Sequence, residues 1–101
     1  MLRYVKVREV CVELGVSDEL LDRLCGEGLI EVKHSLEDEA LLSADEAEKL
    51  RVITVLMREM DVNLPGVEVI LHMREDLRSM RAQFDEILRE MVEELRRRIQ
   101  T

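Results

Sequence analysis

A three-residue turn between two short amphipathic segments constrains the fold of this chain more than any other feature. The turn consists of Gly15, Val16 and Ser17. Residues 7–14 before it place apolar side chains at three- and four-residue spacing, which is the pattern of one helix face. Gly15 is suited to end that helix, and the Ser17 hydroxyl is suited to cap the next one. The sequence therefore predicts a helix-turn-helix.

The second helix of this pair carries acidic residues on its exposed side. Asp18 and Glu19 fall in its first turn, where the helix dipole favours negative charge. Asp22 follows one turn later, and Glu27 lies just beyond Gly26, which ends the helix. A DNA-reading helix would carry Arg and Lys instead, because those side chains contact phosphates and bases. Two interpretations remain open: a solvated face without a partner, or a surface that binds a basic partner.

The negative charge of the whole chain is concentrated around this helix. The formal net charge is -8 at pH 7. Residues 16–46 contain ten acidic residues against Arg23 and Lys33, so this third of the chain carries the entire imbalance. A duplex phosphate backbone would be repelled by the acidic third.

A small β-hairpin, or wing, is expected after the second helix. Leu29–Val32 and Ala40–Leu42 are short runs of β-forming residues on either side of polar residues 33–39. Ser43 then opens a third helix, and its spacing from Glu46 is that of a capping box. The wing and the three helices together predict a winged helix-turn-helix.

The last third of the chain is expected to be one long helix. Pro65 falls at a helix start, where its missing N–H costs nothing, and nothing breaks the helix after Val67. Seven apolar residues recur at helical spacing, as roughly three heptads: Leu77, Met80, Phe84, Ile87, Leu88, Met91 and Leu95. A helix this long cannot cover its apolar stripe on a small head. Pairing with a second copy, or folding back on the preceding helix, is therefore expected.

The predicted architecture is mainly α, with a winged helix-turn-helix domain at residues 1–61 and a C-terminal helical dimerisation segment at residues 62–101. Burying a Leu- or Phe-sized side chain is worth about 1.5–3 kcal/mol, which favours covering the stripe. We therefore predict a homodimer, joined as a coiled coil through Leu77, Phe84, Ile87, Met91 and Leu95.

The other chemistry-bearing residues form no pattern of an enzyme, a metal site or a cofactor site. Cys11, Cys25, His34 and His72 lack the spacing of metal ligands, and no glycine-rich phosphate loop is present. We expect reduced, buried thiols, no cofactor and no catalysis. No apolar run is long enough for a transmembrane helix, and the first residues lack the apolar centre of a signal peptide. A cytoplasmic location without membrane contact is expected.

The order of these elements resembles that of the MerR superfamily. Residues 7–31 read VREVCVELGVSDELLDRLCGEGLIE and are similar to its helix-turn-helix. The wing, the Ser-capped third helix, the Leu-Pro-Gly start of the fourth helix and the long terminal helix follow in the same order. Residues 60–80 read MDVNLPGVEVILHMREDLRSM and are similar to the corresponding segment of CbpM-type chaperone modulators. The heat-shock repressors of the superfamily share an NLxGV segment as well.

The resemblance to CbpM-type modulators implies a protein partner. Those proteins bind and inhibit the J-domain co-chaperone CbpA, and J-domains carry a basic helix that contacts the Hsp70 chaperone. By this resemblance, the surface that receives such a helix would consist of Asp18, Glu19, Asp22 and Glu27. Attraction between opposite charges would raise the association rate more than the final affinity.

The resemblance also leaves open the alternative of a DNA-binding transcription regulator. Its phosphate contacts would come from the basic residues of the first domain: Arg3, Lys6, Arg8, Lys49, Arg51 and Arg58. DNA-binding members of the superfamily carry an Arg where Asp22 stands. They carry an Arg-Arg-Tyr wing where Ala40, Leu41 and Leu42 stand. Each departure removes a contact to phosphate or base, so DNA is the less favoured partner.

Overall fold

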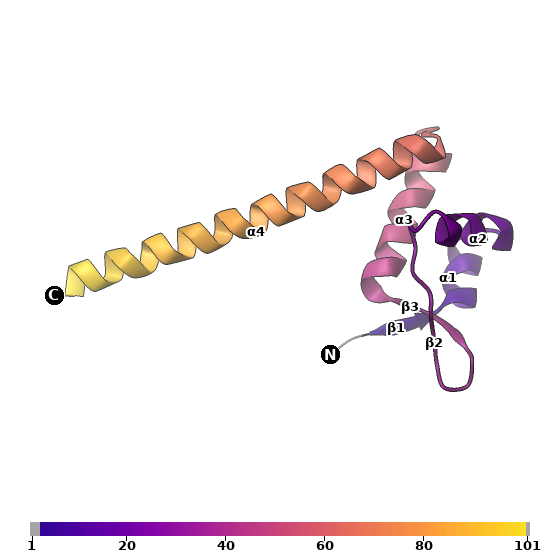
Figure 1. Cartoon of the computed structure of the whole chain (residues 1–101), viewed down its shortest axis with the longest axis horizontal. Helices are drawn as coiled ribbons and strands as arrows, with labels where there is room; N and C mark the ends of the chain where they lie inside the picture. Colours follow the sequence, from indigo (N-terminus) through magenta and orange to yellow (C-terminus); the bar gives the residue numbers. More distant parts are fainter. Residues whose placement is uncertain (1–2, 101) are drawn as a thin grey trace. The chain divides into compact units, whose positions relative to one another are not determined.

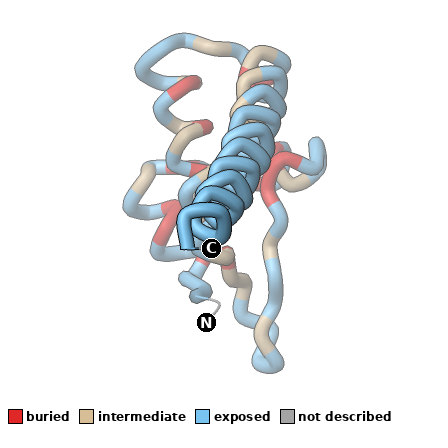
Figure 2. The backbone as a smooth tube through the Cα atoms, turned by 90° about the vertical axis from the view of Figure 1, so that its left-hand side faces the viewer, coloured by how far each residue is buried: buried red, intermediate tan, exposed pale blue. Residues whose placement is uncertain are grey.

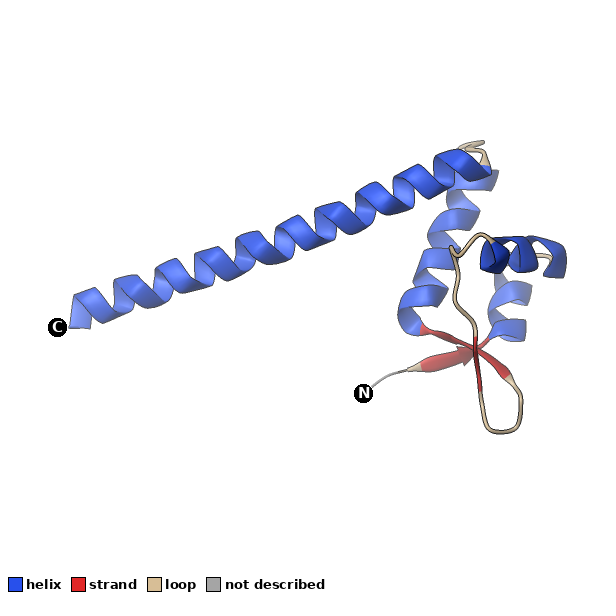
Figure 3. Cartoon of the chain, viewed as in Figure 1, coloured by secondary structure: helices blue, strands red, loops and turns tan. Residues whose placement is uncertain are grey.

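The computed structural model describes residues 3–100 of the chain. The described part contains, in order, β1 (Tyr4–Lys6), α1 (Val7–Leu14), α2 (Asp18–Gly26), β2 (Lys33–His34), β3 (Ala40–Ser43), α3 (Ala44–Arg58) and α4 (Leu64–Gln100) (Figure 1, Figure 3). The chain divides into two compact units after Val67. Residues 3–67 are called the head below, and residues 68–100 the arm. The predicted fold class, mainly α with a small β wing and a long final helix, is confirmed.

The predicted helix-turn-helix is formed by α1 and α2. Gly15 ends α1 in the left-handed conformation, with a φ of 67° that other residues rarely adopt. The N–H of Val16 donates to the Cys11 carbonyl at 2.8 Å. Ser17 then caps α2, because its Oγ accepts a hydrogen bond from the Leu20 N–H at 3.1 Å. The glycine stop and the serine cap predicted from the sequence are therefore both confirmed.

A three-stranded antiparallel sheet lies beside these helices, in the order β1-β3-β2. Val5 of β1 pairs with Leu42 of β3, and Lys33 of β2 pairs with Leu41 of β3. β1 was not expected from the sequence. Because β3 is the central strand, its Leu42 is covered completely and becomes part of the core.

The wing is the hairpin of β2 and β3, but its first strand lies later than predicted. The expected strand at Leu29–Val32 is wrong, because β2 covers Lys33–His34. Leu29 and Ile30 are buried instead, and their N–H groups both donate to the Leu24 carbonyl, at 2.9 and 3.4 Å. These two apolar residues therefore complete the end of α2 and fill the core rather than pair in the sheet.

The core of the head is built from aliphatic side chains of helices and sheet, and Figure 2 marks the buried positions along the backbone in red. The largest fully buried side chains come from α2, β3, α3 and the first turn of α4: Leu24, Leu42, Leu50, Ile53 and Val67. No polar or charged residue is buried among residues 3–100. Each fully buried aliphatic side chain contributes about 1.5–3 kcal/mol, so this cluster stabilises the head.

The first turn of α4 belongs to the head. Oδ1 of Asn63 accepts a hydrogen bond from the Gly66 N–H at 2.9 Å, and Pro65 lies in the first turn, as predicted. Gly66 leaves little room for a larger residue, since a Cβ there would lie 2.8 Å from Cγ1 of Val62. Val67 closes this turn and is fully buried. The core thus fixes where the long helix begins.

Candidate partner-binding surfaces

The acidic surface expected on α2 consists of Asp18, Glu19, Asp22 and Glu27, and all four residues are exposed. The first three lie within about 100° of arc, because successive residues of an α-helix are 100° apart. Glu27 is the C-cap residue at the opposite end of α2. None of the four side chains has an ion pair or a hydrogen bond within the described residues. The structure therefore brings together three of the four acids as an unpaired, solvated cluster.

The negative charge of this surface affects the pKa values of two cysteine thiols. Burial raises the pKa of the Cys11 thiol, and the negative charge of Asp18 raises that pKa further. Burial likewise raises the pKa of the Cys25 thiol, with added effects of Asp22 and Glu46. Cys11 is buried, as expected, whereas Cys25 is half-buried, and both are free thiols. Both are therefore protonated and weakly nucleophilic at neutral pH.

Four of the six basic residues considered as phosphate contacts are bound to groups of their own chain. Lys6 pairs with Glu39 at 3.3 Å, and Arg51 pairs with Glu13 at 3.3 Å. Lys49 pairs with Glu46 at 2.9 Å, and Arg58 donates to backbone carbonyls at the end of α1. Among the described residues, only Arg3 and Arg8 of this set have no such partner. The head therefore offers few free cations to a phosphate backbone.

Glu46 connects the base of the wing to α3. The N–H of Glu46 donates to Oγ of Ser43 at 3.1 Å, which is one half of the predicted capping box. The carboxylate does not return to Ser43. Its Oε1 accepts from the Glu31 N–H at 2.6 Å, and its Oε2 pairs with Lys49. The second half of the capping box is thus replaced by a link to the segment that leads into β2.

The tip of the wing is fixed by the hydroxyl of Ser35. Its Oγ accepts from the N–H groups of Glu37 and Glu39, at 3.2 and 3.1 Å. The Asp38 N–H donates to the Ser35 carbonyl at 2.9 Å, and Asp38 adopts a left-handed φ of 62°. These bonds hold Leu36 fully exposed at the tip. At the superfamily's Arg-Arg-Tyr positions, Ala40 and Leu41 are half-buried and Leu42 is fully buried.

The two most exposed large apolar residues of the head, Val12 and Leu36, were not predicted from the sequence to belong to a site. Val12 is 77% exposed, although it lies in a helix whose other valines are buried. Leu36 is exposed within the acidic tip of the wing. The sequence pattern around each residue could have indicated its exposure. Val12 is out of phase with the apolar stripe of α1, and Leu36 interrupts a run of polar residues.

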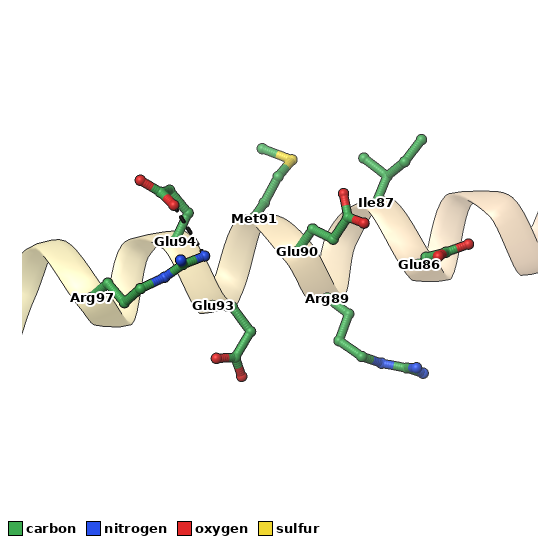
Figure 4. Close-up of a pocket in the computed structure, with 8 residues that line it drawn as sticks. All are labelled: Glu86, Ile87, Arg89, Glu90, Met91, Glu93, Glu94 and Arg97. Atoms are coloured by element: carbon green, nitrogen blue, oxygen red, sulfur yellow. Dashed lines mark ion pairs between the residues drawn. The ribbon is translucent and has the colours of Figure 1, made fainter.

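The arm carries a stripe of exposed apolar side chains along α4, and none of residues 68–100 is buried. The five residues predicted to form a dimer interface are 55–65% exposed: Leu77, Phe84, Ile87, Met91 and Leu95. Figure 4 shows Ile87 and Met91 pointing to one side of the helix. Arg89 and Glu93 point to the other side. The arm by itself is therefore amphipathic.

The stripe keeps the predicted heptad spacing over part of its length and also fits an eleven-residue repeat. The seven-residue spacing of Leu77, Phe84 and Met91 ends there, because the next position is Arg98. Three interleaved series are spaced by eleven: Met73, Phe84 and Leu95; Leu77, Leu88 and Ile99; Met80 and Met91. A period of about 3.67 residues per turn favours a straight or slightly right-handed pair of helices.

The arginines at the end of α4 pair with acids of the same helix. Arg97 lies 3.2 Å from Glu94, and Arg98 lies 3.1 Å from the same carboxylate. Arg96 lies 3.9 Å from Glu93. Such exposed pairs contribute about 0.3–0.5 kcal/mol each. The basic cluster is therefore part of the charge pattern of the helix and does not indicate a nucleic-acid site.

The two histidines lie on different elements, and neither is on the helices that carry the cysteines. His34 is in β2, and His72 lies on α4, 3.9 Å from Asp76. Within residues 3–100, no group of three or more His, Cys, Asp or Glu side chains is arranged to hold a metal ion. No helix in the same range has the length and apolar character needed to cross a membrane.

The chain matches one known protein family over most of its length. The model of the family described as MerR HTH family regulatory protein matches residues 5–97. The chain belongs to this family, whose members are regulatory proteins rather than enzymes. No curated protein and no solved structure gives a significant match to the chain. The resemblance to the MerR superfamily is thus confirmed, while the narrower resemblance to CbpM-type modulators stays a prediction.

Proposed function

We propose that this protein is a chaperone modulator that binds a J-domain co-chaperone and inhibits it. The acidic surface of α2 receives the basic helix of the J-domain, which is the helix that contacts the Hsp70 chaperone. One observation carries the proposal: Asp18, Glu19 and Asp22 are exposed on one side of α2 and form no ion pair with any cation of the described residues. Occupation of the basic helix would exclude Hsp70 from the same surface.

The charges support such a partner in two ways. Unpaired carboxylates attract a basic helix over a distance, which raises the association rate. The same carboxylates repel phosphate, and most basic residues of the head are already engaged with acids or carbonyls. A helix-turn-helix with this charge pattern is better suited to a cationic protein surface than to a duplex.

The test is charge reversal of the acidic surface. Asp18→Lys, Glu19→Lys and Asp22→Lys, combined in the full chain, should abolish binding to the J-domain co-chaperone of the same organism. The matched control is Glu68→Lys, Glu75→Lys and Glu86→Lys, which changes the charge equally on the arm, away from the apolar stripe. Calorimetry measures affinity, and circular dichroism checks that both variants remain helical. Equal affinity of the two triple variants would contradict the proposal.

We also propose that the protein is a homodimer joined through the apolar stripe of the arm. The support is the row of side chains that are more than half exposed over about seven turns of helix. Covering contiguous apolar surface of this extent is a common reason for two chains to associate.

Regulation by DNA binding is the second candidate, and membership of the MerR HTH family favours it. In this case Arg3 and Arg8, which have no ion pair within the described residues, would contact phosphates. A gel-shift series at low salt separates the two functions. A shift that requires Arg8, in a protein that does not bind the J-domain, would favour the regulator. If no shift is seen at micromolar protein concentration, DNA-binding regulation is excluded.

A further inference from the structure

A groove of about 790 Å³ lies between the outer side of α1 and the wing. Its walls include Arg8, Glu9 and Val12 of α1, Asp18 of α2, and Asp38 and Glu39 at the wing. All of its lining residues belong to the head. Only Asp18 is shared with the acidic surface of α2, so the groove continues that surface towards the wing.

The groove combines an exposed apolar residue with an acidic rim. Val12 is 77% exposed. Glu9, Asp18 and Asp38 have no ion pair within the described residues, whereas Lys6 is already paired with Glu39. The lining holds four acids against two cations, and the Lys6–Glu39 pair leaves three unpaired acids against Arg8. An occupant would therefore meet an apolar contact surrounded by unpaired negative charge.

Both walls of the groove are held in place by hydrogen bonds. On the α1 side, the Gly15 carbonyl accepts from Nη2 of Arg58 and the Val16 N–H donates to Cys11. On the wing side, Ser35 holds Asp38 through its carbonyl. The groove therefore exists in the free protein and does not need a partner to form.

We propose that this groove receives one face of a basic amphipathic helix from the protein partner. An apolar side chain of that helix packs on Val12, and cationic side chains on either side meet Asp18 and Asp38. A volume of about 790 Å³ is that of a well-formed small-molecule pocket, which is room for a few side chains, and helices bind in grooves through anchors three and four residues apart. Because Asp18 belongs to both surfaces, the inference rests on the proposed function and extends its site.

Protection of an introduced thiol tests occupancy directly. Val12→Cys places a reactive thiol in the groove, while the native thiols of Cys11 and Cys25 are slow because they are protonated and at least partly covered. The J-domain co-chaperone of the same organism is added at about ten times its Kd. The rate of iodoacetamide labelling at position 12 should then fall about tenfold, since only about one tenth of the chain remains free.

Affinity measurements provide an independent test. Val12→Lys and Asp38→Asn should each weaken binding about tenfold, which corresponds to about 1.4 kcal/mol. Asn at position 38 tolerates the left-handed backbone there. The control for loss of one acid is Glu59→Gln, which is exposed, lies outside the groove and should keep the parent affinity. Circular dichroism checks that each variant is folded.

The outcomes separate this inference from the proposed function. If reversal of the acids on α2 abolishes J-domain binding but Val12→Cys is labelled at the free rate in the complex, the groove inference is overturned and the proposed function stands. If the J-domain does not bind at all, the proposed function fails, and the groove is probed with synthetic helices of about 14 residues, or four turns. Protection by a Leu/Lys helix but not by a Leu/Glu helix supports the groove. Protection by neither, or by duplex DNA instead, overturns it.

Discussion

Arg58, the last residue of α3, donates a hydrogen bond from Nη1 to the carbonyl oxygen of Leu14 at 2.6 Å. Its Nη2 donates to the carbonyl of the next residue, Gly15. These carbonyls lie at the end of α1, where the carbonyl groups of the last helical turn have no N–H donors within the helix. One guanidinium group therefore caps α1 and ties it to the far end of α3, and this cation is not free for a phosphate.

Loss of this double contact is expected to destabilise the head. Arg58→Ala should lower the free energy of unfolding by about 1–2 kcal/mol, because charged donors to carbonyls are removed. Arg58→Lys should recover only part of this, since an ammonium group lacks the planar fork of guanidinium. Urea denaturation measures both. Arg78→Ala on the arm is the control, because Arg78 has no ion pair within the described residues. Equal effects at both positions would argue against the cap.

The serine that begins α3 should also matter for stability. Ser43→Ala removes the acceptor of the Glu46 N–H and is expected to cost about 1 kcal/mol, within the usual range for N-caps. Ser79→Ala makes the same chemical change in the middle of α4, where alanine is the better helix former, and should be neutral or slightly stabilising. Thermal unfolding of both variants provides the comparison. A neutral Ser43→Ala would mean that the cap contributes nothing.

Stability should fall as pH rises above about 9. The thiol pKa values of Cys11 and Cys25 are raised above 9.0 in the folded chain. Between 9.0 and the folded-state pKa, the unfolded chain has lost thiol protons that the folded chain keeps. The unfolded state then binds fewer protons, so the free energy of unfolding decreases with pH. This contribution is fully present below pH 9.0 and is lost as pH rises through the folded-state pKa.

The measurement is urea denaturation under reducing conditions at several values between about pH 7.5 and 10.5. A double variant, Cys11→Ala and Cys25→Ala, keeps every other titrating group and should show a shallower decline with pH. If the slopes of the two proteins coincide, the thiols do not contribute to the pH dependence.

Disruption of the arm's apolar stripe should give a monomer. Phe84→Asp places a charge among Met80, Leu88 and Met91, where burial against a second copy would be costly. Ser79→Asp adds the same charge on a different side of α4 and should leave the dimer intact. Sedimentation equilibrium at tens of micromolar distinguishes the two masses. A monomer for the parent chain would contradict the dimer itself.

Features set by neighbouring residues could be predicted from the sequence. The helix stop at Gly15 and the caps at Ser17 and Ser43 depend on contacts that span a few residues, and the structure confirms them. Features that depend on distant residues could not be predicted. The Glu46 carboxylate binds the N–H of Glu31, fifteen residues earlier, so its expected return to Ser43 was wrong. The same holds for β1, which exists because β3 pairs with it.

The same distinction between local and distant residues applies to the candidate binding surfaces. The acids of α2 could be placed on one side of a helix by periodicity alone. The groove could not, because Val12 and Asp38 come from separate elements that only tertiary packing brings to one lining. The position of the first wing strand could not be predicted either, for a related reason. Leu29 and Ile30 have β-forming side chains, but burial at the end of α2 outweighs that local preference.

The hydroxyl of Ser35 has a consequence for the rate of the binding that we propose at the groove beside the wing. A hairpin tip of this length would ordinarily sample many backbone conformations, and a partner would have to wait for the productive one or restrict the others. Here the N–H groups of Glu37 and Glu39 are already bound, so most of that conformational entropy is lost when the head folds. The wing is therefore preorganised, and an encounter can proceed at nearly the rate at which two rigid surfaces collide and align.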